Sequence, residues 1–293
     1  KSVAVGYASL SIQNFTTATD GFNVAMGYES GAAITTGLSN TLVGGQSGDA
    51  LTDADFNVAV GKEALTTDTL GSKSVAVGMG TLANQNFTTA TDSFNTALGH
   101  IAGNAITTGV QNTLVGALAG DALQDADNNI AIGYQALSSD TLGSRNVAIG
   151  NNALLNQNFT TGTNAYNTAV GFSAGIAVTT GTQNTLVGGL AGDALTAGGS
   201  NVALGTNSLA SDTLGSRSIA IGQGALFTQN FTTATNNHNV AVGYEAGVLI
   251  TTGVNNVLIG GLAGDALTTA GNNIAIGYQA HSTDDLGSRN VSV

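Results

Sequence analysis

Residues 129–133 read Asn129-Ile130-Ala131-Ile132-Gly133. Short runs of small or β-branched residues that end at a glycine are typical of a strand followed by a turn. The same phrase, Asn or Ser, any residue, Ala or Leu, an aliphatic residue and Gly, recurs along the whole chain. Its sixteen glycines are Gly6, Gly27, Gly44, Gly61, Gly78, Gly99, Gly116, Gly133, Gly150, Gly171, Gly188, Gly205, Gly222, Gly243, Gly260 and Gly277.

The residue numbers of these glycines rise in steps of 21, 17, 17 and 17, and the series then repeats. It defines four equal super-repeats, at 2–73, 74–145, 146–217 and 218–289, followed by a partial coil at 290–293. Such a unit is too short for a helical hairpin but suits one coil of a solenoid, whose coils stack about 4.8 Å apart. We therefore predict an all-β fold, a parallel β-solenoid of sixteen coils in a single repetitive segment over residues 1–293.

Composition limits the partners that this chain can have. Only 8% of its residues are charged, the net charge is −12, and cysteine is absent. An acidic chain lacks the basic face that nucleic-acid binding requires, so we expect no nucleic-acid partner. No apolar run reaches the length of a membrane span, so we expect no membrane insertion by this segment. The chain starts inside the repeat, so we expect it to be a piece of a longer protein. We expect an extracellular setting, with which the absence of cysteine is compatible.

Alternation within each strand predicts which side chains face outward. We expect the second and fourth positions, such as Val58 and Val60, to point into the coil. The third position then faces outward, and its uncharged Ala or Leu side chains indicate packing against another chain, most simply in a homotrimer. The predicted inter-chain residues are Ala25, Leu42, Ala59, Ala97, Leu114, Ala131, Ala169, Leu186, Ala203, Ala241, Leu258 and Ala275.

The first position of the phrase forms a second column. It is Asn in most coils, and stacked side-chain amides can hydrogen-bond from coil to coil. The predicted Asn ladder contains Asn23, Asn40, Asn57, Asn95, Asn112, Asn129, Asn167, Asn184, Asn201, Asn239, Asn256 and Asn273.

Acidic residues offer the one candidate metal site. The spacing Asp-x-x-x-Asp-x-Asp occurs in two super-repeats, and carboxylate oxygens at a turn are suitable Ca²⁺ ligands. The third and fourth super-repeats keep only the first of the three acids, which favours solvated turn residues over a calcium cofactor. The candidate ligands are Asp49, Asp53, Asp55, Asp121, Asp125 and Asp127.

Two further patterns recur once in every super-repeat. Asp68 and Lys73 represent the first, which we interpret as a surface ion pair in each super-repeat. The second is a four-residue extension around Asn-Phe-Thr, as at Asn86, which we expect to bulge outward. The extension ends in an aromatic residue or histidine, such as Phe94, that we expect to fold back over the coil.

The phrases at residues 129–137, 146–150 and 273–280 resemble the head repeats of trimeric autotransporter adhesins. They also resemble the 17-residue repeats of phage tail-fibre-like and bacterial surface proteins. The resemblance covers the whole chain. It implies a left-handed parallel β-roll, assembled as a homotrimer in a virion appendage or a cell-surface fibre.

These observations favour a structural or adhesive fibre segment, a stiff rod that contacts a receptor or binds glycans weakly along its length. One alternative is a subunit of a self-assembling extracellular filament or sheath. Another is an ice-binding solenoid, by analogy of fold alone. No catalytic residue is predicted, because His100, His238 and His281 occupy unrelated repeat positions and a catalytic site should be singular.

Overall fold

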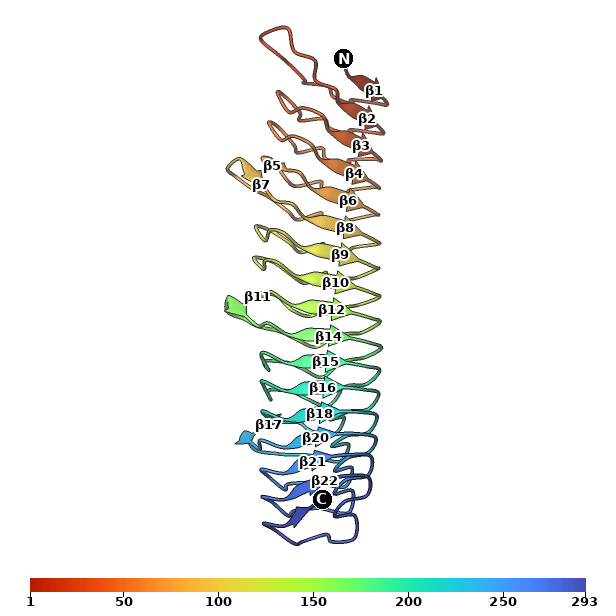
Figure 1. The fold of residues 1–293 in the computed structure, drawn as a ribbon. Helices are drawn as coiled ribbons and strands as arrows, with labels where there is room; N and C mark the ends of the chain where they lie inside the picture. The colour runs from red at the N-terminus through yellow and green to blue at the C-terminus, as the bar shows by residue number, and fades with distance from the viewer. The chain divides into compact units, whose positions relative to one another are not determined.

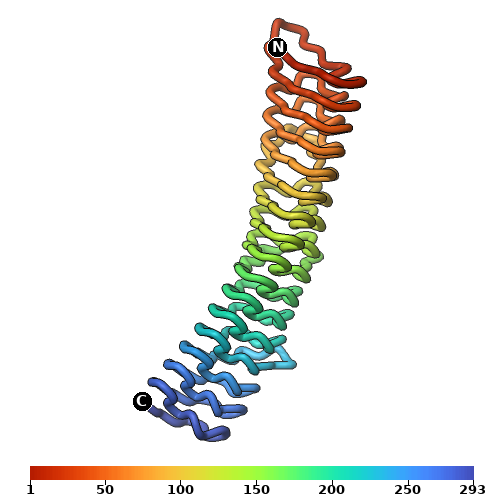
Figure 2. The backbone as a smooth tube through the Cα atoms, turned by 90° about the vertical axis from the view of Figure 1, so that its right-hand side faces the viewer, coloured from red at the N-terminus to blue at the C-terminus, as the bar shows by residue number.

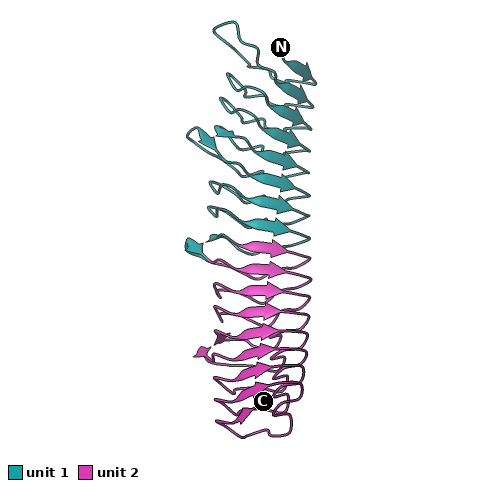
Figure 3. Ribbon diagram, viewed as in Figure 1, with its two compact units in different colours: residues 1–145, 160–164 teal, residues 146–159, 165–293 magenta.

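The structure is a computed structural model that describes all residues 1–293. It confirms the predicted fold class: the chain is a parallel β-solenoid of about 17 turns and contains no helix (Figure 1). Figure 2 shows that the backbone of each unit winds through flattened turns, and that each turn stacks on the one before it in the chain. The chain divides into two compact units, residues 1–145 with 160–164, and residues 146–159 with 165–293 (Figure 3). Each unit repeats the same kind of turn.

In the first unit, the strands of the main sheet pair in parallel and in chain order. They are β1 (Val3–Val5), β2 (Val24–Met26), β3 (Thr41–Val43), β4 (Val58–Val60), β6 (Val75–Val77), β8 (Thr96–Leu98), β9 (Thr113–Val115) and β10 (Ile130–Ile132). Two small parallel pairs accompany them, β5 (Gly71–Ser72) with β7 (Thr91–Asp92) and β11 (Gly143–Ser144) with β13 (Thr163–Asn164).

The second unit has the same construction. Its main strands are β12 (Val147–Ile149), β14 (Thr168–Val170), β15 (Thr185–Val187), β16 (Val202–Leu204), β18 (Ile219–Ile221), β20 (Val240–Val242), β21 (Val257–Ile259), β22 (Ile274–Ile276) and β23 (Val291–Ser292). The small pair here is β17 (Gly215–Ser216) with β19 (Thr235–Asn236).

Equal positions of the phrase stack directly on one another. Ala59 of β4 pairs with Ala76 of β6 in the next coil. The register is also kept across a long coil, because Ala76 pairs with Ala97 of β8. The four additional residues of the long coil therefore leave the main sheet undisturbed. They are accommodated beside it, where β5 pairs with β7.

The predicted facing of the strand residues was wrong. Ala59 is fully buried, whereas Val58 and Val60 on either side of it are partly exposed. The third position therefore points into the coil, and the second and fourth positions point outward. Two walls of a flattened turn lie close together, and this narrow interior accepts small side chains where paired β-branched residues would not fit.

Leucine at the third position is matched by glycine elsewhere in the interior. A Cβ atom added at Gly31 or at Gly48 would lie 2.8 Å from a methyl carbon of Leu42. These two glycines leave the volume that the Leu42 side chain fills. The coil that contains Ala59 has Leu65 at the position equivalent to Gly48, and Leu65 is also fully buried. Large and small residues thus alternate so that the interior is filled.

Candidate association surface

The outward face of the main sheet is the most unusual surface of each unit. The fourth position of every three-residue strand carries an aliphatic side chain or, in β2, Met26, and the second position carries Val, Ile or Thr. Neither position carries a charge. Several of these side chains are substantially exposed, with 48% of Leu98 and 44% of Leu204 accessible to solvent. We call the two columns together the aliphatic face. Its fourth-position members are Val5, Met26, Val43, Val60, Val77, Leu98, Val115, Ile132, Ile149, Val170, Val187, Leu204, Ile221, Val242, Ile259 and Ile276.

The residues that the sequence assigned to inter-chain packing lie elsewhere. All twelve are buried to 0% exposure within the single chain, so none of them can contact a second chain. The prediction of an outward small-residue stripe was therefore wrong in its residues. The cause is the inverted facing of the strand. The residues that were wrongly assigned to inter-chain packing, and that lie in the interior, are Ala25, Leu42, Ala59, Ala97, Leu114, Ala131, Ala169, Leu186, Ala203, Ala241, Leu258 and Ala275.

The Asn column lies inside the coils and connects them. Asn57 Nδ2 donates to the carbonyl oxygen of Gly71 across its own coil at 2.9 Å. Asn57 Oδ1 accepts the backbone N–H of Ser74 in the next coil, also at 2.9 Å. The Asn57 N–H in turn donates to Asn40 Oδ1. The ladder therefore runs mainly from side chain to backbone, with a few direct amide contacts such as Asn40 Nδ2 to Asn23 Oδ1 at 3.2 Å.

The remaining members of the column repeat this arrangement within their units. Each donates from Nδ2 to a carbonyl oxygen on the far side of its own coil. These donors are Asn23, Asn40, Asn95, Asn112, Asn129, Asn167, Asn184, Asn201, Asn239, Asn256 and Asn273. Because these amides are buried, every lost bond would leave a polar group unsatisfied.

Asp68 belongs to a buried polar network and not to a surface ion pair. Its carboxylate is fully buried and accepts the Gln85 Nε2 group at 2.6 Å, together with the backbone N–H groups of Gly71 and Phe87. Lys73 instead pairs with Asp92, with its Nζ 2.6 Å from the carboxylate. The interpretation of Asp68 and Lys73 as a surface ion pair was therefore wrong.

The aromatic residue that folds back is not the one expected. Phe94 is half exposed, with the Lys73 ammonium 5.3 Å from its ring centroid. Phe87, from the Asn-Phe-Thr triplet, is buried instead. The backbone N–H of Phe87 donates to buried Asp68, and this bond holds the start of the extension against the coil.

The candidate calcium ligands have separate hydrogen-bond partners. Asp49 accepts from Thr66, Asp53 from Thr36, and Asp55 from the Leu38 N–H. In the next super-repeat, Asp125 accepts from Thr108 and Asp127 from the Val110 N–H, while Asp121 Oδ1 is buried without a partner. No three Asp, Glu or His side chains gather closely enough to hold a metal ion. These carboxylates connect neighbouring coils.

Partial burial affects four carboxyl groups. Desolvation raises the pKa of Asp49, Asp121 and Asp193 above the ordinary value of 3.8. It also raises the pKa of Asp212, although hydrogen bonds from Phe231 and Gln229 oppose this shift. The folded state therefore disfavours the ionised form of all four groups.

Fold and surface together define a tandem-repeat β-solenoid with an uncharged aliphatic face on its parallel sheet. No protein-family model, curated protein or solved structure matches the chain. The structure has no helix that is long and apolar enough to cross a membrane.

Proposed function

We propose that this chain is a structural segment of a fibre, in which the aliphatic face packs against other copies of the same chain. The observation that carries this proposal is the full or partial exposure of an uninterrupted fourth-position column of apolar side chains in each unit, beside a second-position column of Val, Ile and Thr. Contiguous exposed apolar surface on a protein generally marks an interaction site. The rest of the surface is rich in Asn, Thr and Ser. It also exposes aromatic side chains such as Tyr7 and Tyr28 after the glycine of the phrase, but Gly45 and Lys62 interrupt that column in the following coils.

A second copy is the occupant that fits this face. The stacking of coils sets the distance between successive residues of the aliphatic face, and a second solenoid of the same kind has the same distance between its residues. Each chain has a net charge of −12, so contacts between copies would ordinarily be repulsive. The aliphatic face carries no charge, and it allows two acidic chains to meet without placing like charges opposite each other.

We further propose three copies in each assembly, as the resemblance to adhesin heads implies. The resulting rod would serve at a cell surface or in a virion appendage and display or reach a receptor. Its role is mechanical and not catalytic. Open-ended stacking into a filament and ice binding by the flat sheet are the rival functions.

The native mass of the purified chain, measured by light scattering on a sizing column, tests this proposal. We expect three times the chain mass for the wild type and a single chain for Leu98→Lys, because a charge cannot be buried against an apolar partner. Thr89→Lys, on the exposed extension, should keep the wild-type mass. A monomeric wild type would contradict the proposal. If that monomer also showed thermal hysteresis, the ice-binding alternative would replace it, and heterogeneous, open-ended masses would favour the filament.

A further inference from the structure

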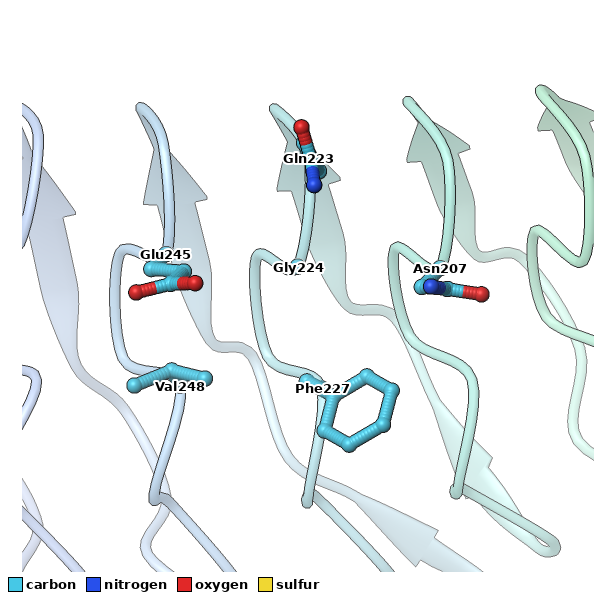
Figure 4. Close-up of a pocket in the computed structure, with 6 residues that line it drawn as sticks. All are labelled: Asn207, Gln223, Gly224, Phe227, Glu245 and Val248. Carbon is cyan, nitrogen blue, oxygen red and sulfur yellow. The ribbon is translucent and has the colours of Figure 1, made fainter.

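One surface hollow breaks the repetition of the second unit. It has a volume of about 330 Å³ and is lined by Asn207, Gln223, Gly224, Phe227, Glu245 and Val248. Three successive turns contribute, those that follow β16, β18 and β20. Figure 4 shows Gly224 on the middle turn, between the turns that carry Asn207 and Glu245. Phe227 follows Gly224 on the middle turn, and Val248 follows Glu245 on its turn.

Gly224 leaves room for the hollow because it has no side chain. Asn207, Gly224 and Glu245 occupy the same position in their coils, shortly after the glycine of the phrase. All three have positive φ angles, of 57°, 66° and 50°. A Cβ atom at Gly224 would lie 3.2 Å from Glu245 Cγ and would begin to fill the gap.

In the two preceding super-repeats the equivalent place carries an amide side chain that this one lacks. In the preceding super-repeat the residue equivalent to Gly224 is Asn152, which has a side chain and a similar φ of 59°. One super-repeat earlier it is Gly80, but there Asn104 Nδ2 donates to the Gly80 carbonyl oxygen at 2.8 Å and covers it. Val248 stands at the position equivalent to Asn104, and its aliphatic side chain cannot donate such a bond. The hollow is therefore a local departure from the repeat.

The lining combines groups that recognise sugars. Phe227 is 38% exposed and offers the face of an aromatic ring. Glu245 offers carboxylate acceptors, and Asn207 and Gln223 offer amides that both donate and accept. No lining residue is basic, so an acidic ligand has no counter-charge there. The volume lies at the lower end of the roughly 300–1,000 Å³ typical of ligand sites, which suits one small ring.

We propose that this hollow binds a single neutral pyranose sugar, with an apolar face of the ring on Phe227 and its hydroxyl groups on Glu245, Asn207 and Gln223. Aromatic rings have a negative face that attracts polarised C–H groups. Two amides beside the carboxylate favour hydroxyl groups over a simple cation, which would need only Glu245 and Phe227. This proposal goes beyond the mechanical role and does not depend on self-association.

Saturation-transfer NMR with free glucose, galactose, mannose and N-acetylglucosamine tests the site. Gly224→Asn and Phe227→Leu introduce the residues that the preceding super-repeat carries at these positions, Asn152 and Leu155, so both variants should fold. We expect at least one sugar to bind the wild type with a millimolar dissociation constant. Each variant should weaken that binding by about tenfold or more, the equivalent of about 1.4 kcal/mol.

Glu29→Ser provides the matched control. Glu29 follows Tyr28 as Glu245 follows Tyr244, and hydrogen bonding to the neighbouring glutamate raises the pKa of both tyrosines. Glu29 lies outside the hollow, so this variant should bind sugar like the wild type, whereas Glu245→Ser should not. Absence of binding by all four sugars would overturn the proposal, as would binding of choline or lysine alone. Equal sugar binding by the wild type and Gly224→Asn would overturn it too, if thermal melts show both folded.

Discussion

Gly44 and Gly45 are adjacent in the chain, but the fold needs only the first to be glycine. Gly44 has a φ of 137°, which side chains rarely permit, and a Cβ atom there would lie 2.4 Å from the Gly61 carbonyl oxygen. Gly45 has an ordinary φ, and a Cβ atom added there would have the Tyr28 carbonyl oxygen as its nearest neighbour, 4.0 Å away. The recurring glycine of the phrase is therefore required by both the backbone angle and the stacking of coils.

Substituting these two glycines should have unequal effects. We expect Gly44→Ala to lower the free energy of unfolding by more than about 1 kcal/mol, because alanine is strained at this φ and collides with the next coil. Gly45→Ala should change it by less than about 0.5 kcal/mol. Urea-induced unfolding followed by circular dichroism measures both. Equal losses for the two variants would show that stacking against Gly61 does not constrain Gly44.

The facing of the strand residues was the part of the fold that the sequence interpretation missed. Alternation allows two solutions, and β-branched Val58 and Val60 were assigned to the core because they are the more apolar. A relevant pattern was present in the sequence: Leu42 occurs in a coil that has Gly48, whereas the coil of Ala59 has Leu65 at the equivalent position. Such exchange of volume is expected only between residues that share an interior. The outward-facing strand residues could therefore have been identified from the sequence.

At the scale of elements, the long coil is held by polar groups. Gln85 Nε2 donates to Asp68 Oδ2 at 2.6 Å and to Ser74 Oγ at 2.9 Å, and Gln85 Oε1 accepts Asn95 Nδ2 at 2.9 Å. Ser74 stands at the start of its coil, where most coils have Asn, and its hydroxyl accepts the Gln85 amide. All four side chains are buried.

Removing this glutamine should destabilise the first unit strongly. Gln85→Ala leaves three buried polar groups without one of their partners, and we expect it to reduce the free energy of unfolding by at least about 2 kcal/mol. Asn84→Ala, at the exposed neighbouring residue, should cost less than about 0.5 kcal/mol. Chemical denaturation of both variants makes the comparison. A Gln85→Ala variant as stable as Asn84→Ala would exclude a stabilising role for the network.

The periodicity of the sequence predicted the strands well, but it did not predict the side-chain contacts that join one coil to the next. The regular spacing of the phrase predicts coils because stacked strands must keep register, as Ala59, Ala76 and Ala97 do. The burial of Asp68 could not be predicted in the same way, since a carboxylate near Lys73 is usually a solvated surface group. Its partner Gln85 lies in the next coil and becomes its neighbour only through stacking.

At the scale of the whole molecule, the carboxyl groups should make the protein more stable in mild acid. Burial raises the pKa of Asp49, Asp121, Asp193 and Asp212, so their charged forms oppose folding at neutral pH. As the pH falls through these raised values toward the ordinary 3.8, the folded state takes up protons before the unfolded state does. The free energy of unfolding therefore rises over this window.

Thermal melts between pH 7 and about pH 5 test that sign. We expect the melting temperature to increase as the pH falls, and to increase less in Asp193→Asn. Asp193 is suitable because its Oδ1 atom is buried without a hydrogen-bond partner. A melting temperature that decreases over the same range would mean that stabilised carboxylates dominate, contrary to the shifts described above.

If other copies of the chain cover the aliphatic face, they should shield a thiol placed on it from chemical labelling. The chain has no cysteine, so Leu204→Cys places a single thiol on β16 and Thr206→Cys places one on the following turn. Both positions are exposed in the single chain. We predict that a bulky maleimide labels the Leu204→Cys thiol more slowly as protein concentration rises, while the Thr206→Cys thiol stays reactive. Equal, concentration-independent labelling of both thiols would contradict coverage of this face by other copies.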